Sequence, residues 1–182
     1  MEEKKGHEFL VEAAKILNDS GVKFKMIIIG GGYSPENIAL FKKLEDKIIA
    51  FKLENIIELH GNGSDQNSEV LKYMSVSDIF VRPSIKTKSG DVEGIPNTMV
   101  EAGYFGMPLI GTNSGSIGEV LIDCTTGLMV PESDPQALAN AIQKLIENPD
   151  LRSNYGQNAK THIISNFDIE KCLPLLEDSL SK

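Results

Sequence analysis

The sequence predicts an α/β protein with a parallel β-sheet covered by helices on both faces. Short apolar runs, the clearest at residues 24–29, alternate along the chain with longer segments whose apolar residues recur at helical spacing. Glycines follow several of the apolar runs, as at residues 30–32 and 61–63. Strands that are short, apolar and separated by helices are typical of a parallel sheet that is buried on both faces.

Length and composition suit one globular domain. The chain has 182 residues, of which 41% are apolar and 24% are charged. No apolar run approaches the roughly 18 residues that a membrane-spanning helix needs. The net charge of −8 argues against broad binding to nucleic acids, whose phosphates attract clustered Lys and Arg. The N-terminal sequence has no hydrophobic signal region, so we expect a cytoplasmic protein, with Cys124 and Cys172 as free thiols.

Local signals place the elements of the first half of the chain. Gly21 suits the end of a first helix, while Ser34 and Pro35 suit the cap and first residue of a second. In chain order we predict a helix at residues 7–18, a strand at 24–29, a helix at 35–52, a strand at 55–59 and a helix at 68–75.

The second half follows the same alternation. Gly106 suits the end of one helix, and Asp134 with Pro135 caps the start of another. In chain order we predict a strand at residues 78–82, a helix at 96–105, a strand at 108–111, a short helix at 117–121, a strand at 127–130, and helices at 135–147, 150–165 and 168–181.

Two acids, Glu93 and Glu101, bracket the most informative stretch, Glu-Gly-Ile-Pro-Asn-Thr-Met-Val-Glu. Proline suits the start of a helix, so we expect this helix to begin between Gly94 and Pro96. Glu93 then lies in the preceding loop and Glu101 in the second turn. Unpaired N–H groups of a first helical turn attract anions, and carboxylates accept hydrogen bonds from hydroxyls. The stretch therefore predicts a site for an anionic group with sugar hydroxyls on either side.

Other loops are expected to meet this site. Ligands of parallel α/β sheets bind at the carboxyl ends of the strands, which lie on one edge. We therefore expect four loops to share one rim, at residues 30–34, 60–65, 84–95 and 111–116.

Several motifs, in this order, resemble the C-terminal half of the group 1 glycosyltransferases. They are Lys4-Lys5-Gly6 before a helix, Ile-Ile-Ile-Gly-Gly-Gly, the Glu-x7-Glu spacing, and Thr-Asn-Ser-Gly-Ser-Ile-Gly-Glu at residues 112–119. The resemblance covers essentially the whole chain. It implies a Rossmann-like domain of the GT-B fold from a retaining enzyme that uses a nucleotide sugar. The sequence from Pro83 to Pro96 looks most like bacterial enzymes of capsule, colanic acid or other envelope polysaccharide assembly.

The resemblance also implies residue roles. Lys5 would neutralise the donor diphosphate and Glu93 would contact the donor sugar, which makes them the candidate catalytic residues. Glu101 would accept hydrogen bonds from both ribose hydroxyls. The alternative is that Lys5 is a surface lysine and that both acids are ordinary residues near a helix start, favoured by the helix dipole. Backbone amides after the first acid face the phosphates in the family. We carry that role over to Gly94, Ile95, Asn97 and Thr98, leaving out Pro96, which has no N–H.

Further loops match segments that surround the nucleotide in the family. Gly31 and Gly32 would form a tight turn against it, while Gly61 and Pro83 would lie near its base. Turn chemistry explains these glycines equally well. The glycine run is not a dinucleotide fingerprint, because the third glycine of that pattern would fall on Pro35.

The family has parts that this sequence lacks. A strand ending in Gly-Arg precedes the lysine in the family, its arginine being the second diphosphate cation, and an acceptor-binding domain lies N-terminal to it. We therefore expect an excised C-terminal half, residues 1–182, with its first strand truncated, that binds nucleotide weakly and does not transfer sugar. A helix at about residues 166–182 would brace the missing N-terminal acceptor domain.

For the full enzyme the resemblance implies transfer of a sugar from a nucleoside diphosphate sugar to an acceptor hydroxyl, in polysaccharide or glycolipid biosynthesis. We expect no metal and no cofactor, because no Asp-x-Asp motif is present, and membrane association only at the periphery through the full-length enzyme. Two alternatives stay open. One is a non-catalytic nucleotide-binding or interaction module. The other is an NAD-dependent oxidoreductase domain, for which Glu54 lies about twenty positions after the glycines but the glycine spacing fails.

Overall fold

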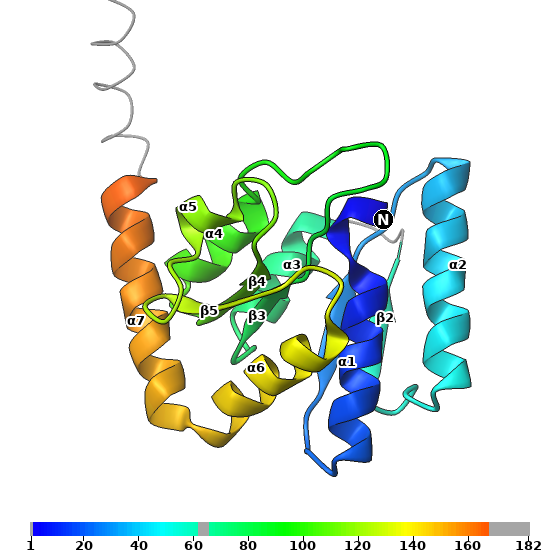
Figure 1. Cartoon of the computed structure of the whole chain (residues 1–182), viewed down its shortest axis with the longest axis horizontal. Helices are drawn as coiled ribbons and strands as arrows, with labels where there is room; N and C mark the ends of the chain where they lie inside the picture. The colour runs from blue at the N-terminus through cyan, green and yellow to red at the C-terminus, as the bar shows by residue number, and fades with distance from the viewer. Residues whose placement is uncertain (1, 62–65, 168–182) are drawn as a thin grey trace, which may run out of the picture.

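A computed structural model describes residues 2–61 and 66–167 as parallel strands between two layers of helices (Figure 1). The strands are β1 (Met26–Ile29), β2 (Ile57–His60), β3 (Phe80–Arg82), β4 (Leu109–Thr112) and β5 (Gly127–Val130). The helices are the 3-10 helix η1 (Glu3–Lys5), α1 (His7–Asp19), α2 (Pro35–Ala50), α3 (Gln66–Met74), α4 (Asn97–Tyr104), α5 (Ile117–Val120), α6 (Pro135–Glu147) and α7 (Pro149–Asn166). The predicted alternation of strand and helix is confirmed. The predicted helix at 168–181 and part of the loop at 60–65 lie outside the described residues.

The strands form two parallel sheets where the sequence suggested one. β1 pairs with β2, and β3, β4 and β5 pair in that order, with Phe80 opposite Leu109 and Leu109 opposite Gly127. Within the described residues, β1 and β3 therefore each pair along one edge only. The two sheets still share one core, in which Ile28 of β1 and Ile110 of β4 are both buried. The predicted fold of parallel strands covered by helices on both faces is confirmed, and within the described residues the strands pair as two sheets.

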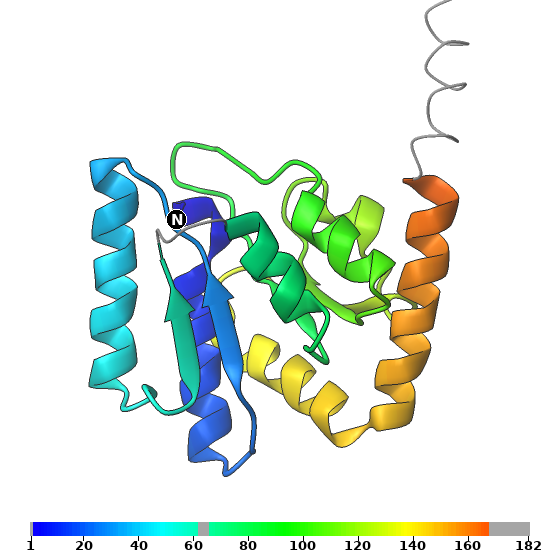
Figure 2. The ribbon, with the colours of Figure 1, turned by 180° about the vertical axis from the view of Figure 1, so that it is seen from behind.

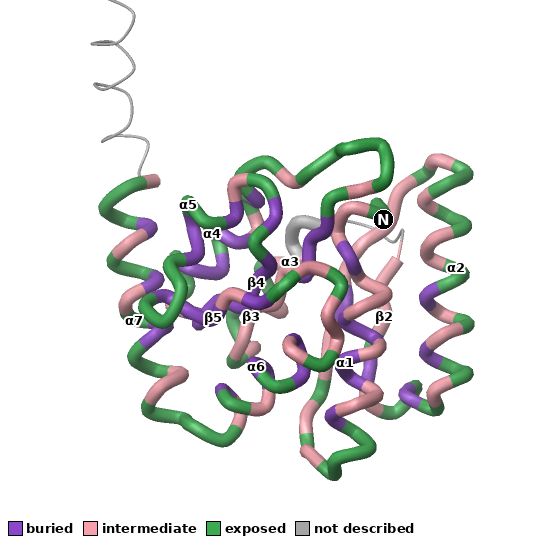
Figure 3. The backbone as a smooth tube through the Cα atoms, viewed as in Figure 1, coloured by how far each residue is buried: buried purple, intermediate pink, exposed green. Residues whose placement is uncertain are grey.

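Each face of the strands has its own apolar core. On one face α1, α2 and α6 pack together, with Leu17, Leu138 and Leu145 almost fully buried. On the other face α4, α5 and α7 enclose Met99 and Ile117. Figure 2 shows α3 and α4 on the side away from α1, and Figure 3 shows the buried residues concentrated along β4, β5 and the inward side of α1. The strand ends are thereby fixed from both sides.

Two helix starts follow the predicted capping chemistry. The Ser34 hydroxyl accepts a hydrogen bond from the Asn37 N–H at 3.2 Å, with Pro35 as the first residue of α2. Asp134 accepts in the same way from the Ala137 N–H at 2.9 Å before Pro135 of α6. Cys124 is a free, exposed thiol as expected, while Cys172 lies outside the described residues. None of the described helices is long and apolar enough to cross a membrane.

Candidate functional site

The carboxyl ends of the strands bring the N-terminus of the chain beside the loop after β3. The Ile85 N–H donates to the Lys4 carbonyl at 2.8 Å. Gly6, with φ of 62°, lies so close to the Pro83 carbonyl that a Cβ would stand 1.8 Å from its oxygen. Only glycine fits such an approach in this backbone conformation. The Lys-Lys-Gly motif is therefore fixed against the predicted rim.

Glu93 is anchored through its backbone to the loop after β4. The Ser116 N–H donates to the Glu93 carbonyl at 3.2 Å. Gly115, with φ of 56°, lies against the same residue, and a Cβ there would stand 1.9 Å from the Glu93 carbonyl oxygen. The predicted meeting of the loops after β3 and β4 is confirmed.

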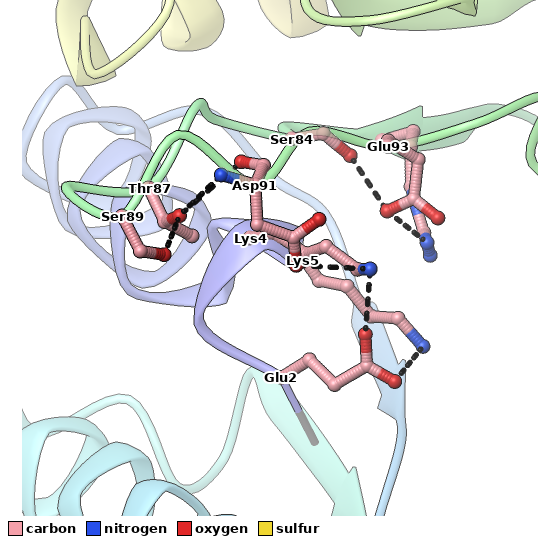
Figure 4. A network of polar contacts seen from close by, with 9 residues as sticks. Glu2, Lys4, Lys5, Ser84, Thr87, Ser89, Asp91 and Glu93 are labelled. Atoms are coloured by element: carbon pink, nitrogen blue, oxygen red, sulfur yellow. Dashed lines mark hydrogen bonds and ion pairs between the residues drawn. The ribbon is translucent and has the colours of Figure 1, made fainter.

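The Glu93 side chain contacts two residues of the β3 end. Arg82 Nη2 lies 2.9 Å from Glu93 Oε2, and the two side chains are each 13% exposed. Ser84, which is fully buried, places its hydroxyl 3.5 Å from the same oxygen (Figure 4). Sequence reasoning missed Arg82. The available signal was a charged residue at the carboxyl end of an otherwise apolar strand.

Lys4 and Lys5 have different surroundings (Figure 4). Lys4 Nζ lies 3.2 Å from an Asp91 oxygen and 3.5 Å from Glu2. Hydrogen bonding to Asp91 raises the pKa of Lys4 above its ordinary value. Lys5, the predicted diphosphate ligand, lies 3.8 Å from Glu2 and has a 30% exposed side chain. Lys4 therefore ties η1 to the long loop, and Lys5 is the less engaged of the two.

The helix after Glu93 begins one residue later than its proline suggested. Pro96 has an extended backbone, with ψ of 111°, and is the N-cap, so α4 starts at Asn97. The helix starts there because the Pro96 carbonyl accepts the first helical hydrogen bonds, from the N–H groups of Met99 and Val100. Four predicted phosphate donors have N–H groups that make no hydrogen bond to the described residues: Gly94, Ile95, Asn97 and Thr98. Glu101 is exposed in the second turn, as predicted.

The predicted glycines of the first two loops pack against α2. A Cβ on Gly32 would stand 2.3 Å from the Asn37 amide nitrogen, and one on Gly61 would stand 2.8 Å from the Phe41 ring. Gly31 lies between β1 and α2, and Pro83 is buried just after β3. These positions are on the predicted rim. Their close packing is a sufficient reason for Gly32 and Gly61, so a nucleotide contact there stays a prediction.

His7 lies beneath the cationic part of the rim. Burial, together with the nearby charges of Arg82 and Lys5, lowers its pKa to about 3. Its Nδ1 atom is buried and, like Arg82 Nε, makes no hydrogen bond to the described residues. His7 is therefore neutral near pH 7. In the described part of the chain, no three His, Cys, Asp or Glu side chains lie together as metal ligands would.

The fold and this rim define a class of protein: an α/β domain in which a helix N-terminus, a lysine and two acids lie near the carboxyl ends of parallel strands. A family model described as glycosyl transferases group 1 matches residues 1–162. The chain belongs to this family, as its motifs implied.

Curated relatives include glycosyltransferases named for polysaccharide synthesis. The amylovoran biosynthesis glycosyltransferase AmsK of Erwinia amylovora is 34% identical over 143 residues, which are 79% of this chain and 33% of that protein. The putative colanic acid biosynthesis glycosyltransferase WcaL of Salmonella typhimurium is 36% identical over 75% of this chain and 32% of its own length. The chain thus spans about a third of the length of these relatives.

Solved structures share the fold. Anabaena Alr3699/HepE in complex with UDP superposes with a TM-score of 0.84 at 22% identity, over 99% of this chain and 46% of that one. The C-terminal domain of a group 1 glycosyl transferase, LpcC, from Francisella tularensis has a TM-score of 0.77 at 25% identity, over 93% of this chain and 83% of that one. The predicted match to the C-terminal domain of a GT-B glycosyltransferase is confirmed.

Proposed function

We propose that this chain is the donor-binding part of a retaining glycosyltransferase that moves a sugar from a nucleoside diphosphate sugar to an acceptor hydroxyl. The observation that carries the proposal is the meeting of Lys5, Glu93 and the open N-terminus of α4 on one rim. An anion and a set of hydroxyls are the partners that these groups share.

Each group has a distinct part in the proposed complex. The N–H groups of Gly94, Ile95, Asn97 and Thr98 face the diphosphate together with Lys5, because the start of a helix carries partial positive charge. Glu101, one turn into α4, accepts hydrogen bonds from the ribose hydroxyls. Glu93 contacts the donor sugar. Gly31, Gly32, Gly61 and Pro83 line the nucleotide side of the rim.

The proposed chemistry depends on charge that develops on the leaving diphosphate as the glycosidic bond breaks. Fixed cations and N–H groups at that position stabilise the transition state without reorganising. Lys5 and the first turn of α4 are such groups, so the proposal assigns this work to the chain itself and not to a metal ion or other cofactor.

The biological setting is inferred from relatives. AmsK and WcaL are named for amylovoran and colanic acid biosynthesis, and HepE has been crystallised with UDP and with UDP-glucose. We infer a role in building a polysaccharide or glycolipid, with an acceptor domain supplied by the rest of a longer enzyme. We place that enzyme in the cytoplasm, with at most peripheral attachment to the inner face of the membrane.

Calorimetric titration of the 182-residue chain with UDP, GDP and NAD tests the proposal. We expect at least one nucleoside diphosphate to bind, and Lys5→Met to weaken that binding. Lys15→Met is the matched control, because Lys15 lies on α1 and, among the described residues, forms its ion pair with Asp19 on the same helix. Binding of NAD with no response to UDP or GDP would contradict the glycosyltransferase proposal and favour the oxidoreductase alternative.

A further inference from the structure

We propose that Arg82 is a positioning residue for Glu93, holding one carboxylate oxygen so that the other is presented to the donor sugar. The inference rests on the proposed function, because it takes Glu93 to be the residue that meets the sugar. Arg82 would then affect the affinity for the donor sugar and leave the affinity for the nucleotide unchanged.

Both side chains of the described residues that hydrogen-bond to the Glu93 carboxylate reach the same oxygen. Arg82 Nη2 lies 2.9 Å from Oε2, and the Ser84 hydroxyl lies 3.5 Å from it. Ser84 is itself fixed, because its carbonyl accepts a hydrogen bond from the buried Thr112 hydroxyl. The carboxylate is therefore oriented by Arg82 of β3 and by Ser84 just after it, and Ser84 is in turn hydrogen-bonded to β4.

The other oxygen, Oε1, is left available. It makes no hydrogen bond to residues 2–61 or 66–167, and it is not among the fully buried unpaired atoms. A carboxylate oxygen in this state accepts a hydrogen bond from a ligand hydroxyl. Because the Glu93 backbone is also held by Ser116, the position of Oε1 is set before a ligand arrives. Such preorganisation strengthens binding by lowering the entropy that is lost on association.

Packing alone does not account for an arginine at this place. Phe80 and Val81 precede it in β3, and its Nε–H is buried without an acceptor among the described residues. A buried unpaired donor is unfavourable, and an apolar side chain would avoid it. His7, which lies nearby, is neutral near pH 7 because its pKa is about 3, so it does not compete with Arg82 for the carboxylate. The contact to Glu93 is the feature that requires a charge here.

Calorimetry on the 182-residue chain tests the inference with two matched ligand pairs, UDP against UDP-glucose and GDP against GDP-mannose. In the native chain we expect the sugar to add affinity over the nucleotide. In Arg82→Met we expect affinity for the nucleotide sugar to fall about tenfold, while affinity for the nucleotide changes by less than about twofold. Arg82→Lys keeps the charge but lacks the planar guanidinium, so it should restore part of the loss.

A double mutant separates positioning from a direct contact. In the Glu93→Gln background, Arg82→Met should cause no further loss, because the carboxylate that it orients has gone. Arg152→Met is the matched control. Arg152, in the first turn of α7, donates to the carbonyls of Leu145 and Ile146 at the end of α6. The junction of α6 and α7 lies at the end of the molecule away from η1 (Figure 1). Its loss should lower the melting temperature and leave the ratio of sugar to nucleotide affinity unchanged.

Several results would overturn the inference. One is an equal loss of affinity for nucleotide and nucleotide sugar in Arg82→Met, and another is additivity of the two substitutions. If circular dichroism shows that Arg82→Met does not fold, Arg82→Lys is used to decide. A reduced ratio of nucleotide-sugar affinity to nucleotide affinity in Arg82→Lys supports the inference, and an unchanged ratio is the third overturning result. A native chain that binds neither ligand pair overturns the proposed function itself. If the native chain binds both pairs and Arg82→Met binds them equally well, only the inference about Arg82 is overturned.

Discussion

The two halves of the rim are built in different ways. Over β1 and β2, Gly32 and Gly61 approach side chains of α2, the Asn37 amide and the Phe41 ring. Over β3 and β4, Gly115 approaches the backbone of Glu93, and the carboxylate of that residue pairs with Arg82. A side chain moves aside more easily than a backbone carbonyl. In the first half, the glycines therefore let loops pack against α2. In the second half, the close backbone contact fixes the position of a candidate functional residue, Glu93.

The largest expected effect tests this contrast directly. Gly115→Ala forces a Cβ to within 1.9 Å of the Glu93 carbonyl oxygen at a φ of 56°. We expect it to lower the free energy of unfolding by about 3 kcal/mol and to abolish nucleotide-sugar binding. At Gly61→Ala the nearest atoms to the added Cβ belong to the Phe41 side chain, which can shift, so a loss of about 1 kcal/mol is expected. Urea denaturation measures both. Equal losses would show that the two halves do not differ in rigidity.

Substitution of Glu101 is expected to give the next largest effect. Glu101→Ala should weaken nucleotide binding by about 1–3 kcal/mol, because two hydrogen bonds from the ribose to a charged acceptor are lost. The folding of the chain should not change, since Glu101 is exposed. Calorimetry with the nucleotide that the native chain binds is the measurement. An unchanged affinity would return Glu101 to the class of surface acids near a helix start.

His7, beneath the second half of the rim, should make stability sensitive to acid. Its pKa falls from 6.5 in the unfolded chain to about 3 in the folded chain. Between these values only the unfolded chain binds the proton. The contribution of neutral His7 is therefore complete above pH 6.5 and is lost as the pH falls toward 3. The expected slope is at most about 1.4 kcal/mol per pH unit.

Denaturant unfolding of the native chain and of His7→Gln, across the same pH range, checks this prediction. The glutamine variant lacks the titrating group and should show a shallower loss of stability in acid. Parallel pH profiles for the two proteins would show that His7 is not the source of the slope.

The smallest effect is expected at the ion pair between Lys4 and Asp91. The carboxylate side chain is 58% exposed, and exposed pairs contribute little and are screened by salt. Asp91→Asn should leave the melting temperature nearly unchanged, and what change there is should disappear in high salt. A large shift that persists in salt would mean that this pair holds the long loop more firmly than its exposure indicates.

Local signals in the sequence were sufficient for most of the fold. The Asp134 cap and the apolar stripe after it predicted α6 with its observed bounds. The run from Gly127 to Val130 predicted β5 in the same way. Capping and periodicity act within a few residues, so one segment contains the whole signal. The split of the strands into two sheets depends on pairing between distant segments, for which no single segment carries a signal.

The site was predictable where a motif existed. The spacing of Glu93 and Glu101 around the start of α4 was anticipated, to within one residue at the N-cap. The Arg82 contact was not, because its partners are 11 positions apart on a strand end and a loop, and only the folded loop brings them together. The different contacts of Lys4 and Lys5 were missed for the same reason, because they depend on where the folded loop places Asp91.

The single-edge pairing of β1 and β3 has a practical consequence for anyone who expresses this chain alone. Within the described residues, each of these strands has a row of N–H and C=O groups along one edge that no neighbouring strand uses. Such edges template the addition of further strands from any source, including other copies of the same polypeptide. The yield of monomer should therefore fall as the protein is concentrated, and a short extended peptide that docks along the edge should act as a solubilising additive.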